Sequence, residues 1–287
     1  MLTGANSPPV RVDESGVRSA HARRLICAAA IGLLACACAI PLPRIPHAEP
    51  TIPPLPQTSR IYDSQGRYIT DLHADQNRTI VPISDIPVPV RDAVVSIEDQ
   101  RFYEHAGVDV KAIIRAAIQN AKEGRIVQGG STITEQLVKN TITGDERTLS
   151  RKIKDAVLAF ELEKRYTKDQ ILAMYLNTVY FGQGAYGIQA AAESYFSIPP
   201  NQLTLAEGAL LAGLIASPST YDPVFHPDQA MRRRNLVLSK MLEQEWIDQA
   251  TYLAARAEDL ALNVRKPAPY PAAFVGRRSE ARRVGAE

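Results

Sequence analysis

The run that decides the fold is Glu98-Asp99-Gln100-Arg101-Phe102-Tyr103-Glu104-His105-Ala106-Gly107, and Gly129-Gly130-Ser131-Thr132-Ile133-Thr134-Glu135-Gln136 follows it shortly afterwards. The first run places three carboxylates and a histidine around two aromatic residues. The second is a glycine-hinged run of hydroxyl side chains leading into a segment that carries Lys139 and Asn140. A carboxylate beside a loop rich in hydroxyl and backbone donors suits a reaction in which a base activates an alcohol and an anion leaves.

The hydrophobic pattern of most of the chain after residue 90 is helical. Ile113, Ala117 and Ile118 recur at the spacing of one helix face. Capping boxes at residues 167–170 and 204–207 precede apolar runs, and each predicts the start of a helix. The sequence therefore predicts a mainly α fold.

Two shorter patterns precede the helical part. Prolines recur through residues 43–58, which indicates an extended linker. Residues 60–69 then show two short arms of aromatic and β-branched residues around a turn, the pattern of a β-hairpin. We expect little strand after this hairpin.

Composition narrows the class of protein. The chain has 287 residues, of which 45% are hydrophobic and 22% charged, so it has room for one large domain or two small ones. Its formal net charge of +2 gives no argument for a nucleic-acid partner. All three cysteines lie between Cys27 and Cys38, so the rest of the chain has no disulfide framework, thiolate metal site or cysteine nucleophile.

An apolar run near the N-terminus, within residues 25–42, follows several arginines in residues 1–24. This charge pattern favours a cytoplasmic tail followed by an exported body. Three alternatives are open for the run: an uncleaved single-pass transmembrane anchor, a cleaved signal peptide, and a lipoprotein signal with Cys36 acylated. All three predict a catalytic domain on the outer, periplasmic or extracellular side of the cytoplasmic membrane.

The runs at residues 98–107 and 129–136 together resemble the first two motifs of the peptidoglycan glycosyltransferases, family 51, the polymerase domain of class A penicillin-binding proteins. The likeness extends from about Ser59 to the residues after Trp246, and implies a glycosyltransferase domain at residues 59–250. It implies a lysozyme-like helical body with a small membrane-proximal lobe. Residues 251–287 resemble a C-terminal helix and the linker into a transpeptidase domain, whose Ser-x-x-Lys motif does not occur in this chain.

The resemblance implies a reaction in which a sugar hydroxyl displaces a pyrophosphate. A pyrophosphate leaves as a stable anion, so one catalytic carboxylate suffices, with cations offsetting the departing charge. Glu98 lies among apolar neighbours that favour a raised pKa, and the likeness assigns it the role of general base toward the acceptor's 4-hydroxyl. Asp155 stands at the position of the family's second acidic residue. His105 is expected to be a core or capping histidine.

The remaining predicted site residues are those that would bind the substrate. They are either cations or hydrogen-bonding side chains near the two motifs and the third motif that follows them. The set is Arg115, Ser131, Thr132, Gln136, Lys139, Asn140, Arg147, Arg151 and Lys152. No dedicated metal cage is expected, although a divalent cation such as Mg²⁺ or Mn²⁺ is compatible with pyrophosphate departure.

Three positions depart from the family's pattern. Glu135 stands where the second motif usually has Gln, Asp155 where the third usually has Glu, and Ala173 where the fourth usually has Glu. Glu135 and Lys139 are spaced i,i+4, which predicts a local ion pair.

The function that the resemblance implies is polymerisation of lipid II into glycan strands, with release of undecaprenyl pyrophosphate. The expected partners are lipid II, the growing strand, the membrane and other cell-wall synthesis proteins. Two rivals are weighed against it: a catalytically impaired cell-wall assembly scaffold, and a lytic enzyme that cleaves glycan strands. Intact Glu98, Ser131 and Lys139 argue against the scaffold, and the cations argue against the lytic enzyme, which would not need them.

Overall fold

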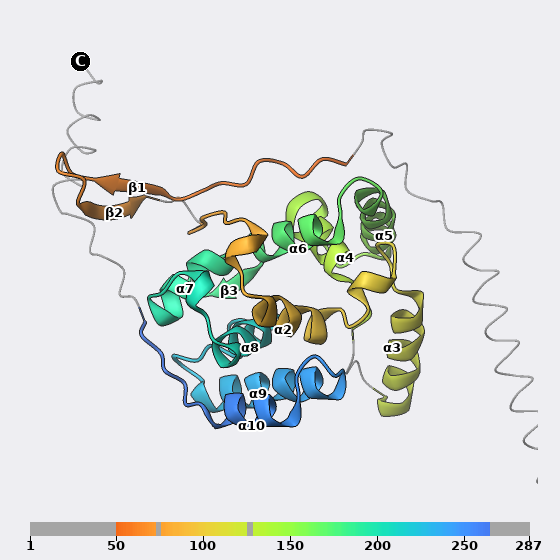
Figure 1. Cartoon of the computed structure of the whole chain (residues 1–287). Helices are drawn as coiled ribbons and strands as arrows, with labels where there is room; N and C mark the ends of the chain where they lie inside the picture. Colours follow the sequence, from red (N-terminus) through yellow and green to blue (C-terminus); the bar gives the residue numbers. More distant parts are fainter. Residues whose placement is uncertain (1–49, 73–75, 125–128, 265–287) are drawn as a thin grey trace, which may run out of the picture. The chain divides into compact units, whose positions relative to one another are not determined.

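The computed structural model describes residues 50–72, 76–124 and 129–264, and these are mainly helical with two small sheets (Figure 1). The predicted α class is confirmed. The expected tail, the anchor or signal segment, the first part of the linker and the end of the C-terminal linker lie outside the described residues. In the described part, no helix is both long enough and apolar enough to cross a membrane. The lysozyme-like body with a membrane-proximal lobe stays a prediction.

The helices follow one another along the chain with short connections. They are α2 (Val88–Glu98), α3 (Val110–Glu123), α4 (Ile133–Val138), α5 (Leu149–Glu163), α6 (Lys168–Leu176), α7 (Ile188–Phe196), α8 (Leu205–Leu214), α9 (Pro227–Glu243) and α10 (Gln249–Ala257). Short turns of other helix types are η1 (Ile83–Asp85), η2 (Phe102–Glu104), η3 (Lys139–Thr143, a π-helical turn) and η4 (Pro200–Gln202).

The core is built around α8. This helix is apolar on all sides and nearly all of its residues are buried, as expected for a helix enclosed by others. It packs between α2 and α9 (Figure 1). Gly208 lies where a Cβ atom would come within 2.7 Å of Val90 Cγ2, so glycine allows α8 to approach α2 closely. Since Glu98 is the last residue of α2, this packing fixes where Glu98 emerges.

The hairpin predicted at residues 60–69 is confirmed. Strands β1 (Ser59–Tyr62) and β2 (Tyr68–Leu72) pair antiparallel around a turn in which Gly66 has φ +76°. A second, smaller sheet pairs β3 (Tyr180–Gly182) with β4 (Ala185–Tyr186). The strand content after the hairpin is therefore small, as expected.

The two predicted capping boxes are present. The Thr167 hydroxyl accepts from Gln170 N at the start of α6, and the Thr204 hydroxyl accepts from Glu207 N at the start of α8. In each box the N3 side chain returns a bond to the backbone N–H of the cap. These reciprocal bonds satisfy donors that the first turn of a helix otherwise leaves unpaired.

Arg234 ties α9 to the end of α10. Its guanidinium is buried and donates to the backbone carbonyls of Glu258 at 2.6 Å and Arg256 at 2.9 Å. Carbonyls at a helix C-terminus have no partner within the helix, so a cation there satisfies them and complements the helix dipole. The role of Arg234 in the described part of the chain is therefore structural.

Candidate active site

Side chains of three other helices act on Glu98, one of them by a direct hydrogen bond. Gln136 of α4 donates from Nε2 to Glu98 Oε2 at 2.9 Å, and Tyr175 of α6 donates from its hydroxyl to Gln136 Oε1 at 2.9 Å. Arg233 of α9 also acts on Glu98 through its charge. The carboxylate at the end of α2 is thus placed by side chains that are distant in the sequence.

The pKa of Glu98 is raised. Burial is the largest cause, since it disfavours the charged carboxylate, and the neighbouring Asp99 carboxylate adds to it. The hydrogen bond from Gln136 and the charge of Arg233 oppose the shift without cancelling it. A carboxylate with a raised pKa is a stronger base than a solvated one, which agrees with the expectation made from its apolar neighbours.

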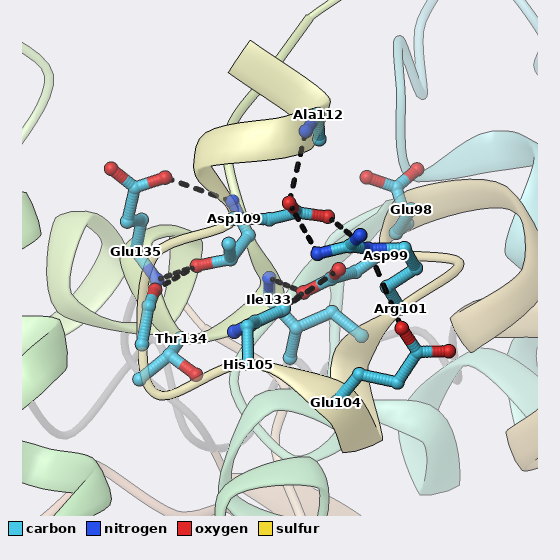
Figure 2. A network of polar contacts seen from close by, with 12 residues as sticks. Glu98, Asp99, Arg101, Glu104, His105, Asp109, Ala112, Ile133, Thr134 and Glu135 are labelled. Atoms are coloured by element: carbon cyan, nitrogen blue, oxygen red, sulfur yellow. Dashed lines mark hydrogen bonds and ion pairs between the residues drawn. The ribbon is translucent and has the colours of Figure 1, made fainter. Parts of the chain in front are cut away.

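Asp99 joins the first run to the second. Its carboxylate accepts from Ile133 N, the first residue of α4, at 3.0 Å, and pairs with His105 Nε2 at 3.0 Å (Figure 2). Both side chains are buried. A carboxylate at a helix N-terminus satisfies an unpaired N–H and complements the dipole. His105 is therefore a buried partner of Asp99, the structural use expected for it.

Thr132 makes a second junction between the two runs. Its hydroxyl donates to the Gly107 carbonyl at 2.6 Å and accepts from Glu135 N at 3.1 Å as the N-cap of α4. Gly107 has φ +86°, and a Cβ there would lie 2.7 Å from the backbone of Ala159. Thr132 is buried, so its hydroxyl is used inside the protein and does not line the pocket described next.

A polar pocket of about 360 Å³ opens beside Gln136. It brings together seven of the predicted site residues and two further acids, Glu135 and Asp145. Its lining residues are Ser131, Glu135, Gln136, Lys139, Asp145, Arg147, Arg151, Lys152 and Asp155. Glu98 is not part of the lining, but Gln136 borders the pocket and bonds Glu98, so Glu98 and the cations are neighbours.

Lys152 is fixed at the pocket wall. Its Nζ lies 3.2 Å from Glu135 Oε1 and donates to Ser131 Oγ at 2.7 Å. The predicted Glu135–Lys139 ion pair is wrong: Lys139 pairs with Asp145 at 2.9 Å instead. The physical reason is that the buried carboxylate of Glu135 is already engaged: Oε2 accepts from Thr132 N in the capping box and Oε1 faces Lys152.

Asp155 lines the pocket together with the four cations Lys139, Arg147, Arg151 and Lys152. Its side chain is buried, accepts from the Thr143 hydroxyl at 2.6 Å and pairs with Arg151 one turn earlier on α5. Arg151 also donates to the Glu146 carbonyl. Asp155 therefore orients Arg151, and through Thr143 it also binds the loop that carries Asp145 and Arg147. The hydrogen bond that Lys139 donates to Asp145 lowers the pKa of the Asp145 carboxyl below its usual range.

Besides Thr132, two predicted binding residues are not part of the pocket lining. Arg115 is exposed on α3 and Asn140 is exposed in the π-helical turn, and neither lines the pocket. Within the described ranges, no three His, Cys, Asp or Glu side chains gather where they could hold a metal ion. Assistance by Mg²⁺ or Mn²⁺ stays a prediction.

Sequence reasoning missed Tyr175, Arg233 and Asp145 as parts of the site. Tyr175 lies in an apolar helical run and Arg233 lies within three consecutive arginines, and neither pattern indicates an interaction with Glu98. Asp145 is a solvated loop residue next to Gly144, and only the fold shows that it faces Lys139. The sequence drew attention to the basic residues Lys139, Arg147, Arg151 and Lys152 instead of to this acid.

A family model described as Transglycosylase matches residues 65–242, more than half of the chain. This chain belongs to the transglycosylase family of class A penicillin-binding proteins. The matched region lies within the predicted domain at residues 59–250 and contains Glu98, Gln136, Tyr175 and every residue that lines the pocket.

Similar members of the transglycosylase family are named penicillin-binding proteins. Penicillin-binding protein 1A of Aquifex aeolicus is 47% identical over 75% of this chain and 29% of its own length. Penicillin-binding protein 1F of Bacillus subtilis is 43% identical over 75% of this chain and 30% of its own length. Penicillin-binding protein 1A of Neisseria flavescens is 40% identical over 84% of this chain and 31% of its own length. The chain spans about 30% of the length of these relatives.

Proposed function

We propose that this chain is a peptidoglycan glycosyltransferase. It polymerises lipid II, the undecaprenyl-pyrophosphoryl disaccharide-pentapeptide, and releases undecaprenyl pyrophosphate. Membership of the transglycosylase family supports glycosyl transfer to peptidoglycan. The observation that carries the finer assignment is the pairing of Glu98, whose pKa burial raises, with a cation-lined pocket reached through Gln136.

In this proposal Glu98 is the general base. Its carboxylate takes the proton from the 4-hydroxyl of the acceptor sugar while that oxygen forms a bond to the anomeric carbon of the donor. The bond from that carbon to the pyrophosphate oxygen breaks on the opposite side, so the configuration inverts. The electron pair leaves with the pyrophosphate, which needs no general acid.

The pocket cations would stabilise the departing pyrophosphate. Lys139, Arg147, Arg151 and Lys152 present four positive charges against the carboxylates of Glu135, Asp145 and Asp155. Fixed cations stabilise charge that develops in a transition state most strongly where they need not reorganise. Asp155 holds Arg151 and, through Thr143, the segment before α5, and Glu135 holds Lys152, so these two cations are ordered before substrate arrives.

The proposed location follows from the substrate. A lipid-linked donor requires the domain to work at the outer face of the cytoplasmic membrane, with the run at residues 25–42 as anchor. The growing glycan strand and other cell-wall synthesis proteins are the proposed partners.

Incubation of the full chain with labelled lipid II, followed by separation of the products by size, tests the proposal. Polymer of several disaccharide lengths is the expected product. Cleavage of preformed glycan strands without polymer would favour the lytic rival. No change to either substrate by folded protein would favour the scaffold.

A further inference from the structure

A chain of two hydrogen bonds ends on the Glu98 carboxylate. The Tyr175 hydroxyl donates to Gln136 Oε1, and Gln136 Nε2 donates to Glu98 Oε2, each at 2.9 Å. Tyr175 is fully buried in α6, whereas Gln136 in α4 is partly exposed at the pocket. The terminal amide of Gln136 is therefore engaged at both of its ends.

The order of donors along this chain is set by chemistry. An ionised carboxylate only accepts hydrogen bonds, so the NH₂ end of Gln136 must face Glu98. The carbonyl end then needs a donor, and the Tyr175 hydroxyl supplies one. Without that hydroxyl the amide could rotate to hydrate its carbonyl in the pocket, and rotation would break the bond to Glu98. A buried acceptor without a donor is costly, so this rotation would be favoured.

The groups that face Glu98 come from each neighbouring element. Asp99 follows it in the chain, Gln136 and Tyr175 face it from α4 and α6, and Arg233 acts on it from α9. Burial and the negative charges of Glu98 and Asp99 raise the pKa of Tyr175 well above 10, so the hydroxyl stays a neutral donor wherever Glu98 titrates.

We propose that Tyr175 is a positioning residue for the base and acts on Glu98 through Gln136. The pair holds Oε2 of Glu98 and leaves Oε1, which accepts no hydrogen bond from a described residue, to take the proton of the acceptor hydroxyl. This inference rests on the proposed function of Glu98. It gives the Gln136 amide the task of orienting the base instead of binding substrate.

The test compares four variants of the full chain. Tyr175→Phe removes only the hydroxyl, Gln136→Met keeps the side-chain length and removes both bonds, and the double variant combines them. Tyr195→Phe is the matched control, because Tyr195 is equally buried and its hydroxyl donates to the Phe181 carbonyl at 2.9 Å, with no link to Glu98. The Glu98 carboxyl is titrated by carbon NMR of glutamate-labelled protein, with its signal assigned from Glu98→Gln.

Loss of the Gln136 bond removes an interaction that stabilises the charged carboxylate, so the pKa of Glu98 should rise. We expect a rise on the order of 1 unit in Tyr175→Phe and in Gln136→Met. The double variant should match Gln136→Met, since Tyr175 acts through Gln136. The acid limb of the polymerase pH profile should move by the same amount, with kcat reduced and KM unchanged. Tyr195→Phe should match the wild type in every measurement.

An unchanged pKa of Glu98 in folded Tyr175→Phe would overturn the inference, as would additive shifts in the double variant. If Tyr175→Phe did not fold, Gln136→Met would carry the test, and an unchanged pKa there would have the same meaning. The titration of Glu98 needs no catalytic turnover, so the positioning role of Tyr175 and the proposed function can be tested independently. A wild type that makes no polymer would overturn the proposed function, whereas an unchanged pKa in active variants would overturn this inference alone.

Discussion

Glu135 and Lys152 form an ion pair at the pocket wall, with 3.2 Å between Glu135 Oε1 and Lys152 Nζ. The other oxygen of the same carboxylate accepts from Thr132 N at 2.9 Å and completes the capping box of α4. Glu135 is only 2% exposed. One acid therefore caps the helix that carries Gln136 and also offsets part of the positive charge of the pocket.

Glu135→Gln should separate these two roles. An amide oxygen can still accept from Thr132 N, so the cap should remain and the melting temperature should change little. The charge of Lys152 would no longer be offset, so inorganic pyrophosphate should bind more tightly, by about tenfold or less, and the gain should shrink as salt is added. Calorimetric titration beside thermal melting measures both effects. Glu161→Gln, which removes a partly exposed acid of α5 that pairs with Lys164, is the control. Weaker pyrophosphate binding by Glu135→Gln would contradict this account.

Lys139→Ala should weaken ligand binding more than folding. Lys139 is 41% exposed and its partner Asp145 is 91% exposed, so their ion pair should contribute little to stability. Removal of a charge-assisted contact to a pyrophosphate should cost about 1.5–3 kcal/mol of binding free energy. Affinity for a pyrophosphate-bearing ligand and melting temperature are measured together. Lys164→Ala, which removes an exposed cation at the C-cap of α5, is the control. A lower melting temperature with unchanged affinity would show that Lys139 is structural.

Asp155 offers a pair of substitutions with opposite expectations. Asp155→Ala removes the acceptor for Thr143 and the partner of Arg151, and a displacement of about 1 Å in catalytic groups can cost ~10²-fold in rate. Asp155→Glu restores the carboxylate usual in the family and should keep or increase the rate. Polymerase rates of the wild type and both variants are compared. Three similar rates would mean that Asp155 only balances Arg151 on one helix.

Penicillin should not acylate this chain, because its sequence contains no Ser-x-x-Lys nucleophile. The relatives that it matches carry the name penicillin-binding protein, but the chain spans about 30% of their length. Incubation with a fluorescent penicillin and denaturing electrophoresis checks the point. A specific labelled band would reveal a nucleophilic serine that the motif does not describe.

Local patterns predicted those parts of the fold that depend on neighbours in the sequence. The capping boxes at Thr167 and Thr204 and the hairpin turn at Gly66 each involve residues within a few positions of one another. The elevated pKa of Glu98 was also expected, because its apolar neighbours lie on the same helix. In these cases the structure depends on residues close together in the sequence, so a sequence pattern is enough to predict it.

Contacts in the site between residues far apart in the sequence could not be predicted from local patterns. Helical spacing favoured a Glu135–Lys139 pair, but Glu135 pairs with Lys152 and Lys139 pairs with Asp145. The link from Tyr175 to Glu98 joins three helices through Gln136, and nothing in the periodicity of any one helix indicates it. Such contacts follow from packing, which the linear pattern does not contain.

The role of Glu98 as the base in lipid II polymerisation is tested by the polymerase rate of Glu98→Gln. The amide keeps the shape of the side chain but cannot take up the proton, so the rate should fall by ~10²–10⁴-fold without loss of the fold. Glu104→Gln, which changes an exposed acid of the same run, is the control and should keep the wild-type rate (Figure 2). Burial raises the pKa of Glu98, and only its charged form is a base, so the wild-type rate should also fall as the pH drops through that raised pKa. Folded Glu98→Gln protein that retains most of the wild-type rate would contradict the role of Glu98 as the base.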